Sequence, residues 1–286
     1  HRLWGPIRDL AADLADELGH PVQVNAYITP PQSQGFDPHY DTHDVFVLQV
    51  AGRKHWRVHA PVLVDPMPDQ PWGQVADDVA ARAAEQPQID TILTPGDCLY
   101  LPRGFIHSAT ALAEISVHLT FGIHNVTQRD VVSAALDELR AHGWESTLPV
   151  GWDPRGDLSG IRELLAEAAA RLTALDPGTV ADRLLARRAA AQRPEPVAPL
   201  ATVQAAERIT ADDRVRLRRH LIARLDHEVL RVGDTHRVDV TLAQIPAVES
   251  LLPGKPQRVG DLPCEDPVGL VARLMREGVV VLADDD

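Results

Sequence analysis

Cysteine is scarce in this sequence: among 286 residues only Cys98 and Cys264 occur, and they lie far apart. Two distant cysteines form neither a disulfide framework nor a cysteine-rich zinc site, so a reducing cytoplasm is the predicted compartment. The sequence also lacks any run of about 18 apolar residues, and it therefore predicts no membrane span. No GxxxxGKS/T, GxGxxG or GxSxG stretch occurs, which removes a phosphate-binding loop, a dinucleotide fingerprint and a serine-hydrolase elbow.

Positive charge is also in short supply. Lys and Arg number 28 against 41 Asp and Glu, which gives a net charge of −13. This balance argues against a broad nucleic-acid surface and fits a basic protein partner. Because the first residue is His1 rather than Met, we expect that an N-terminal part of the natural chain is missing.

The pattern of the first 125 residues is that of many short strands. After an amphipathic helix at 6–18, alternating or β-branched runs predict strands at 22–28, 44–50, 54–58, 91–93, 97–101 and 115–123. Turn sequences such as Thr94-Pro-Gly-Asp97 separate them, which is typical of a sandwich or barrel.

The pattern becomes helical beyond about Thr127. Leu and Ala at helical spacings predict helices at 130–142, 158–172 and 180–192, followed by a proline-rich linker at 193–199. The tail predicts a helix at 214–225, strands at 229–232 and 237–242, a helix at 268–277 and a strand at 279–282. Helices closed by short strands are typical of a winged-helix module.

The strongest chemical signal is the sequence His39-Tyr-Asp41. Residues i and i+2 of a strand point to the same face, so an imidazole and a carboxylate can reach one metal ion. His107 follows the tight turn Pro102-Arg-Gly104 at the start of another strand, which places a third ligand across from the pair. Two histidines and one carboxylate on one face leave open positions on the metal, as in non-haem Fe(II) oxygenases.

Two longer stretches carry a family resemblance. The segment from His39 through Gln49-Val-Ala-Gly-Arg-Lys-His-Trp56, followed by Gly96-Asp-Cys-Leu-Tyr-Leu-Pro-Arg-Gly-Phe-Ile-His107, resembles the JmjC-type ribosomal oxygenases. The resemblance covers residues 20–125. It implies a mixed α and β architecture: a JmjC cupin, or double-stranded β-helix, at 1–125, a helical dimerisation region at 126–200 and a winged-helix-like domain at 201–286.

The resemblance also implies an activity and its site. These relatives are Fe(II)- and 2-oxoglutarate-dependent enzymes that hydroxylate a ribosomal protein, on histidine in animals and on arginine in bacteria. It assigns the metal to His39, Asp41 and His107, and the distal carboxylate of 2-oxoglutarate to Lys54, since a buried ammonium suits a dicarboxylate. Polar side chains on the first and last barrel strands are expected to line the cosubstrate site: Asn25, Tyr27 and Thr120. His43 and His118 are expected to face the protein substrate.

Other functions stay open at this point. A peptide-tailoring hydroxylase of a biosynthetic pathway would use the same residues, and a catalytically inactive scaffold would keep only the fold. A winged-helix nucleic-acid regulator with a cupin sensor is a different class. Its tail, residues 211–286, carries 11 Lys and Arg against 14 Asp and Glu, although Arg214, Arg216, Arg218 and Arg219 cluster. A module that reads DNA normally presents a basic face, so this reading ranks below the oxygenase.

Overall fold

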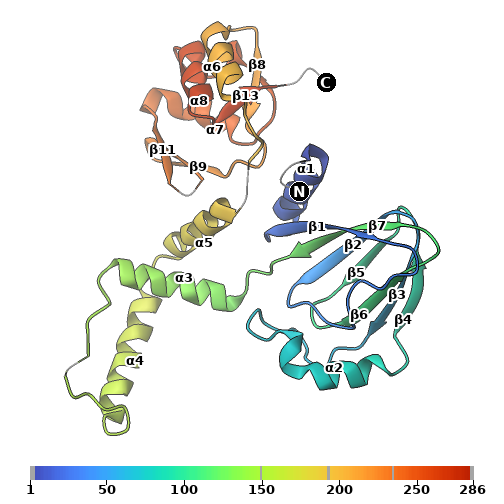
Figure 1. Ribbon diagram of the computed structural model, residues 1–286. Helices are drawn as coiled ribbons and strands as arrows, with labels where there is room; N and C mark the ends of the chain where they lie inside the picture. The colour runs from blue at the N-terminus through green and yellow to red at the C-terminus, as the bar shows by residue number, and fades with distance from the viewer. Residues whose placement is uncertain (1–3, 149, 192–193, 234, 284–286) are drawn as a thin grey trace. The chain divides into compact units, whose positions relative to one another are not determined.

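The computed structural model describes residues 4–148, 150–191, 194–233 and 235–283. The chain divides into two compact units, residues 1–125 and 126–286, and each is described by itself (Figure 1). None of the helices within the described residues is both long and apolar enough to cross a membrane.

Two antiparallel sheets make up the first unit. One has the order β1-β7-β2-β5, and the other has the order β4-β3-β6. The strands are β1 (Val22–Thr29), β2 (Asp44–Ala51), β3 (Lys54–His59), β4 (Ile89–Leu93), β5 (Cys98–Leu101), β6 (Ile106–Ala111) and β7 (Ser116–Ile123). The predicted strands are confirmed with small shifts of their ends. Val45 and Val47 of β2 pack with Trp56 and Val58 of β3, so the core lies between the sheets.

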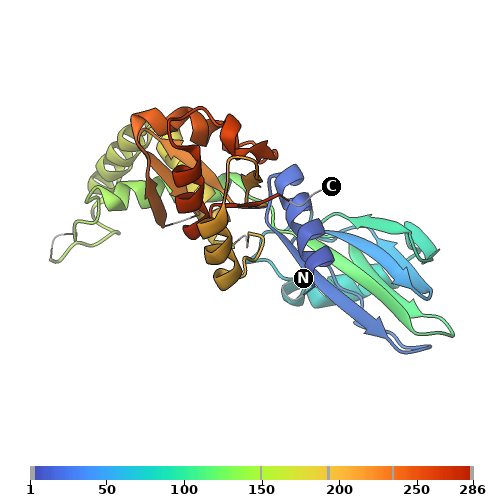
Figure 2. The same cartoon turned by 90° about the horizontal axis from the view of Figure 1, so that it is seen from above.

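Two helical segments cover this sandwich. Helix α1 (Gly5–Leu18) confirms the predicted amphipathic helix, and its Ala11 packs with Val24 and Phe121. Figure 2 shows α1 lying along β1. The second segment is the insertion between β3 and β4, which contains a 3-10 turn at Trp72–Val75 and helix α2 (Ala76–Ala83). Val79 of α2 is buried against Tyr40 and Ile106, and this contact holds the insertion beside the metal-ligand segment.

The expectation that His39 and Asp41 lie in a regular strand is wrong. Only His39 takes part in β pairing, as an isolated bridge to His107. Pro38 cannot donate a ladder hydrogen bond, and Asp41 is already in the irregular segment that leads into β2. The i, i+2 relation nevertheless survives locally, because the bridge fixes His39 in an extended conformation.

The second unit begins with three helices and ends in a mixed module. The helices are α3 (Gln128–Ala141), α4 (Leu158–Thr173) and α5 (Pro177–Ala191), and they confirm the predicted ones. A reciprocal capping box between Thr127 and Asp130 starts α3. The module contains α6 (Pro199–Arg208), β8 (Arg214–Leu217), β9 (Ala223–Asp226), β10 (Val229–Val232), β11 (His236–Asp239), α7 (Ile245–Leu251), β12 (Gln257–Arg258), α8 (Pro267–Arg276) and β13 (Val280–Leu282).

The predicted helix at 214–225 is wrong, because this stretch forms β8 and β9. Val215 is fully buried where β8 pairs with β12 and β13, so pairing across the sheet overrides the helical spacing. His220 has a positive φ of 58°, which breaks any helix between the two strands. The helix α6 was missed, because Pro199 was assigned to a linker although proline is favoured in the first helical turn.

Candidate metal centre and cavity

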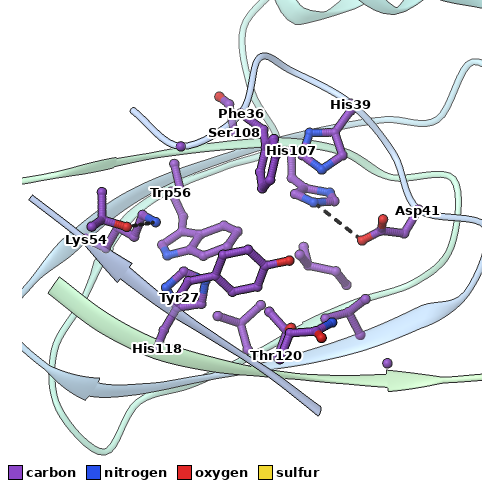
Figure 3. A pocket seen from close by; sticks show the side chains of 18 of the residues that line it. Tyr27, Phe36, His39, Asp41, Lys54, Trp56, His107, Ser108, His118 and Thr120 are labelled. Carbon is purple, nitrogen blue, oxygen red and sulfur yellow. Dashed lines mark hydrogen bonds and ion pairs between the residues drawn. The ribbon is translucent and has the colours of Figure 1, made fainter. Parts of the chain in front are cut away.

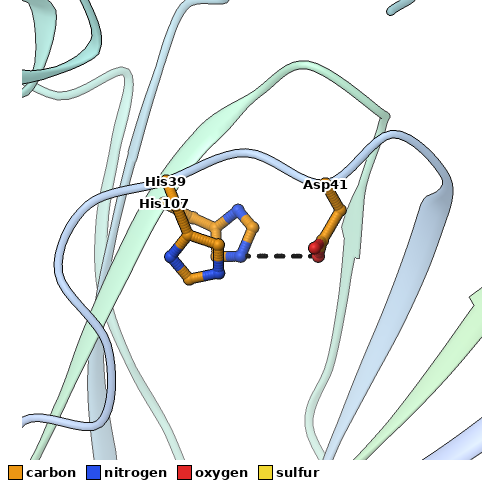
Figure 4. Close-up of side chains that lie close together, drawn as sticks. All are labelled: His39, Asp41 and His107. Atoms are coloured by element: carbon orange, nitrogen blue, oxygen red, sulfur yellow. Dashed lines mark ion pairs between the residues drawn. The ribbon is translucent and has the colours of Figure 1, made fainter. Parts of the chain in front are cut away.

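Three side chains converge at one end of the sandwich. His39 and His107 form a hydrogen-bonded antiparallel pair, with N–O distances of 3.2 and 2.8 Å, so their side chains project to the same side. Their ring centroids are 4.5 Å apart, and His107 Nε2 lies 3.8 Å from Asp41 Oδ2. One ligand atom from each of the three residues lies within 4.8 Å of the others (Figure 4). The structure therefore brings the three predicted ligands to one point.

The backbone orients both imidazoles. His39 Nδ1 lies 2.7 Å from the carbonyl oxygen of Asp37, and His107 Nδ1 lies 3.0 Å from that of Phe105. A carbonyl only accepts, so these contacts assign the proton to Nδ1 and leave Nε2 as the lone-pair nitrogen. Metal-binding histidines commonly use such an outer hydrogen bond. Burial, followed by the neighbouring His39, lowers the pKa of His107, which favours the neutral form that binds a metal.

A cavity of about 130 Å³ extends from this centre between the sheets (Figure 3). One wall is polar, because every second residue of β1 faces it. Asn25 is paired with Thr120 of β7, and Tyr27 is paired with His118. The register explains why residues almost a hundred positions apart form one surface. The predicted cosubstrate residues therefore lie on one wall, and Figure 3 shows the metal ligands at one end and Lys54 at the other.

Lys54 occupies the inner end of the cavity. It is only 3% exposed, its Nζ donates a hydrogen bond of 3.0 Å to Thr29 Oγ1, and it lies 5.8 Å from the ring centroid of Trp56. Burial lowers the pKa of Lys54 to about 8. No carboxylate in the described part of the chain forms an ion pair with it. A buried ammonium without a counterion is costly and points to an anionic ligand.

The remaining predicted residues occupy distinct positions. The Tyr27 ring stacks on His118, with centroids 4.9 Å apart and an interplanar angle of 8°, and it is hydrogen-bonded to Thr120. Burial, followed by Asp41, raises the pKa of Tyr27, so the phenol stays protonated. Asn25 Oδ1 accepts a hydrogen bond of 3.4 Å from Gln23 at the cavity wall.

His43 and His118, both expected to face a protein substrate, lie in different surroundings. His43 lines the cavity close to Gly122, where an added Cβ would come within 3.0 Å of the imidazole. His118 is only 3% exposed. Burial, followed by the charge of the nearby Lys54 ammonium, lowers the pKa of His118 to about 3. The structure thus places His118 near Lys54 at the inner end of the cavity rather than among the more exposed residues that line it.

The cavity residues that sequence reasoning missed include Thr29, Phe36 and Trp56. Trp56 follows Lys54 by two residues on β3, which places both side chains on the same face. Thr29 follows Tyr27 by two residues in the same way. Phe36 packs edge-on against both Tyr27 and His39, at centroid distances of 6.1 and 5.6 Å. Strand periodicity could have identified the first two, whereas the loop around Phe36 follows no period.

The part of the chain that contains the cavity is similar in sequence to known proteins. Residues 3–131 match the JmjC domain. The bifunctional lysine-specific demethylase and histidyl-hydroxylase NO66 of Drosophila persimilis is 40% identical over 119 residues, which are 41% of this chain and 16% of that protein. Human ribosomal oxygenase 1 is 41% identical over 118 residues, or 40% of this chain and 17% of that protein. The match thus spans less than a fifth of either relative.

Solved structures extend the likeness along the chain. A structure of Escherichia coli YcfD is 21% identical, with a TM-score of 0.57 over 96% of this chain and 75% of that one. Another, of the ribosomal oxygenase YcfD with cobalt and 2-oxoglutarate, is 19% identical with a TM-score of 0.52, again over 96% and 75%. At this level of identity the likeness shows the fold, a mixed α and β JmjC cupin.

Proposed function

Because the chain belongs to the JmjC-type ribosomal oxygenase family, we propose that it is an Fe(II)- and 2-oxoglutarate-dependent oxygenase that hydroxylates a protein side chain. One observation supports this most directly. The cavity has a two-histidine, one-carboxylate cluster at one end and a buried ammonium without a counterion at the other. A 2-oxo dicarboxylate has a metal-chelating group and a carboxylate at its two ends, and so complements both.

The donor set fits a ferrous ion. Two imidazole nitrogens and one carboxylate oxygen suit Fe(II), whereas structural zinc sites are closed by four ligands, often cysteines. Within the described residues the cluster has no fourth His, Cys, Asp or Glu, which leaves positions for a cosubstrate and oxygen. When bound, iron with 2-oxoglutarate would activate O2, which is the oxidant: one oxygen atom would enter succinate as CO2 is released, and the other would enter the hydroxylated side chain.

The protein's own residues bind, orient and exclude water. Asp37 and Phe105 hold the two imidazoles through backbone carbonyls, so the ligands need no reorganisation when the ion binds. Lys54 anchors the distal carboxylate, and this contact fixes which end of the cosubstrate meets the metal. The stacked rings of Tyr27 and His118 form part of the cavity wall between the metal ligands and Lys54. Lys54 and His118 are each only 3% exposed, and this burial strengthens the electrostatic contacts at the inner end.

The substrate we propose is an arginine or histidine side chain of a ribosomal protein. The names of the relatives support this class, and the chain's net charge of −13 suits a basic protein. A peptide-tailoring hydroxylase is the alternative with the same chemistry. To test the proposal, the iron-loaded protein is incubated with 2-oxoglutarate and a ribosomal-protein fraction, and peptides are examined by mass spectrometry. An added oxygen atom that depends on Asp41 is expected; no oxidised peptide together with no succinate would contradict it.

The nucleic-acid regulator has less support. Arg216 donates to both carboxylate oxygens of Glu195, at 2.8 and 3.1 Å, and is itself buried. Arg218 donates to the backbone carbonyls of Glu195 and Gly278. Two of the four clustered arginines therefore hold the module together rather than form a basic face. The winged-helix assignment and the cytoplasmic location stay predictions.

Helix α4 supports a homodimer. None of its residues is buried, although it carries Leu158, Leu164 and Leu165, which are all exposed. An apolar helix face of this kind commonly marks an interaction site, and we propose a second copy of this chain as its partner. Leu165→Glu is expected to halve the molar mass measured by light scattering; a wild-type protein that is already monomeric would contradict the dimer.

A further inference from the structure

The inner end of the cavity contains two buried ring nitrogens without partners. Nε1 of Trp56 and Nδ1 of His118 have no hydrogen-bond partner and almost no contact with solvent. An unsatisfied buried polar atom of this kind costs about 1 to 3 kcal/mol. Two of them in one small cavity indicate that a group which would satisfy both belongs there.

These two nitrogens belong to side chains that converge with Lys54. The Trp56 and His118 rings meet edge to face at 5.4 Å, and Lys54 Nζ lies 5.8 Å from the Trp56 ring centroid. All three side chains line the same cavity, and Figure 3 shows them away from Asp41. Because β3 alternates, Lys54 and Trp56 share a face, and β7 contributes His118 from the opposite sheet. The convergence therefore comes from paired strands, not from a loop.

The chemistry of the group is anionic. An indole N–H and an ammonium only donate hydrogen bonds, and the neutral His118 ring carries one N–H of its own. Burial and the nearby Lys54 hold the pKa of His118 down to about 3, so it adds no second cation. With the His118 proton on Nδ1, the three side chains offer donors at one end of the cavity, and within the described residues only Thr29 Oγ1 accepts from Lys54. These donors call for an acceptor with several lone pairs. A carboxylate has two oxygens and about four lone-pair sites.

We propose that Trp56 Nε1–H and His118 Nδ1–H donate hydrogen bonds to the distal carboxylate of the cosubstrate and, with Lys54, complete its receptor. The inference rests on the proposed function and specifies how that site selects a dicarboxylate. Trp56 and His118 supply neutral donors beside one charged group, so the carboxylate is satisfied without burying a second cation. Tyr27 is a positioning residue here, because its parallel stack on the imidazole fixes the plane of the His118 ring.

A ligand-truncation experiment tests the two donors. Binding of 2-oxoglutarate and of 2-oxobutyrate, which lacks the distal carboxylate, is measured by calorimetry on Mn(II)-loaded protein without substrate. Wild type is expected to prefer 2-oxoglutarate strongly. Trp56→Phe keeps a smaller aromatic ring and removes the N–H, and it should reduce this preference about 10-fold, the usual effect of a hydrogen bond to a charged group. His118→Leu should act in the same direction.

The controls separate this inference from the function on which it rests. Trp152→Phe makes the same change at an indole that donates to Asp157 in the other unit, and it should leave the preference unchanged. An unchanged preference in both Trp56→Phe and His118→Leu would overturn the proposal while the function stands. If neither oxo acid binds wild-type protein, the proposed function fails as well.

A spectroscopic measurement on the wild-type protein tests the role of Trp56 even if the Trp56→Phe variant does not fold. In wild-type protein loaded with Zn(II) and labelled with ¹⁵N at tryptophan, the five indole N–H signals can be followed by NMR. One of them should move downfield on addition of 2-oxoglutarate and should not move with 2-oxobutyrate. Equal responses to the two ligands would overturn the role of Trp56.

Discussion

The two ends of the cavity are built differently. At the metal end, His39 and Asp41 come from an irregular segment attached by a single β bridge, and the Asp41 side chain is 35% exposed. At the inner end, Lys54 and His118 come from fully paired strands, and each is 3% exposed. The open end suits exchange of metal, oxygen and substrate, whereas the closed end suits recognition of one fixed group.

The two ends also differ in how charge is balanced. Asp41 lies beside His107 and the metal position, so its charge is compensated locally when an ion binds. Among the described residues Lys54 donates only to a neutral hydroxyl, so its buried charge destabilises the ligand-free protein. Removal of a metal ligand at the open end should therefore abolish activity with little change in the free energy of unfolding. Removal of the Lys54 charge at the inner end should weaken cosubstrate binding and stabilise the ligand-free protein.

The largest effect is expected for Asp41→Ala. This change removes the only carboxylate ligand, and since even outer hydrogen bonds affect metal affinity about 10- to 100-fold, a loss of about 1000-fold is expected. Turnover of 2-oxoglutarate should disappear while circular dichroism and the unfolding midpoint stay close to wild type. Normal turnover by this variant would refute the metal site.

The next effect is expected for Lys54→Met, which should weaken 2-oxoglutarate binding about 100-fold because a charged hydrogen-bonding partner is lost.

The same variant should be more stable than wild type without ligand. The pKa of Lys54 falls from 10.5 to about 8 on folding, so the charged side chain opposes folding at neutral pH and the opposition fades as pH rises toward 10.5. Urea unfolding at pH 7 should show a gain of about 1 to 3 kcal/mol. A clear loss of stability would mean that Lys54 is not strained by burial.

A smaller effect concerns pH. Lys54 is charged below its pKa of about 8, so affinity for 2-oxoglutarate should be constant below pH 8 and fall up to about tenfold per unit above it. The groups facing it are His118, which stays neutral, and Tyr27, whose pKa is raised. Lys54→Arg keeps its charge over this range, so calorimetry on Mn(II)-loaded protein should show a flat profile for it. Equal slopes in the two proteins would assign the pH dependence to another group.

The smallest effect is expected for Thr29→Val, which removes the hydroxyl that accepts from Lys54 while keeping the shape of the side chain. A single neutral acceptor is worth about 1 kcal/mol, so 2-oxoglutarate affinity should change about fivefold or less. Thr202→Val in α6 is the matched control and should have no effect. A change as large as that of Lys54→Met would show that Thr29 itself binds the carboxylate.

The metal end of the cavity could be predicted from the sequence more completely than the inner end. The spacing of His39 and Asp41, with His107 after a turn, was enough to find the three convergent side chains, although the local structure is a bridge and not a strand. The role of Trp56 could not be read in the same way, because no spacing tells whether an indole nitrogen has a partner in the fold. The stretch at 214–225 failed for a related reason: pairing between distant strands decided its structure.

In the proposed site, His39, Asp41 and His107 hold one ferrous ion, and 2-oxoglutarate binds to the same ion. Anaerobic titration of the protein with Fe(II) in the presence of 2-oxoglutarate measures this directly, because the oxo acid chelated to iron gives a visible charge-transfer band. We expect a band that saturates at one iron per chain and is absent from Asp41→Ala. No band in wild type, or the same band in the variant, would contradict it.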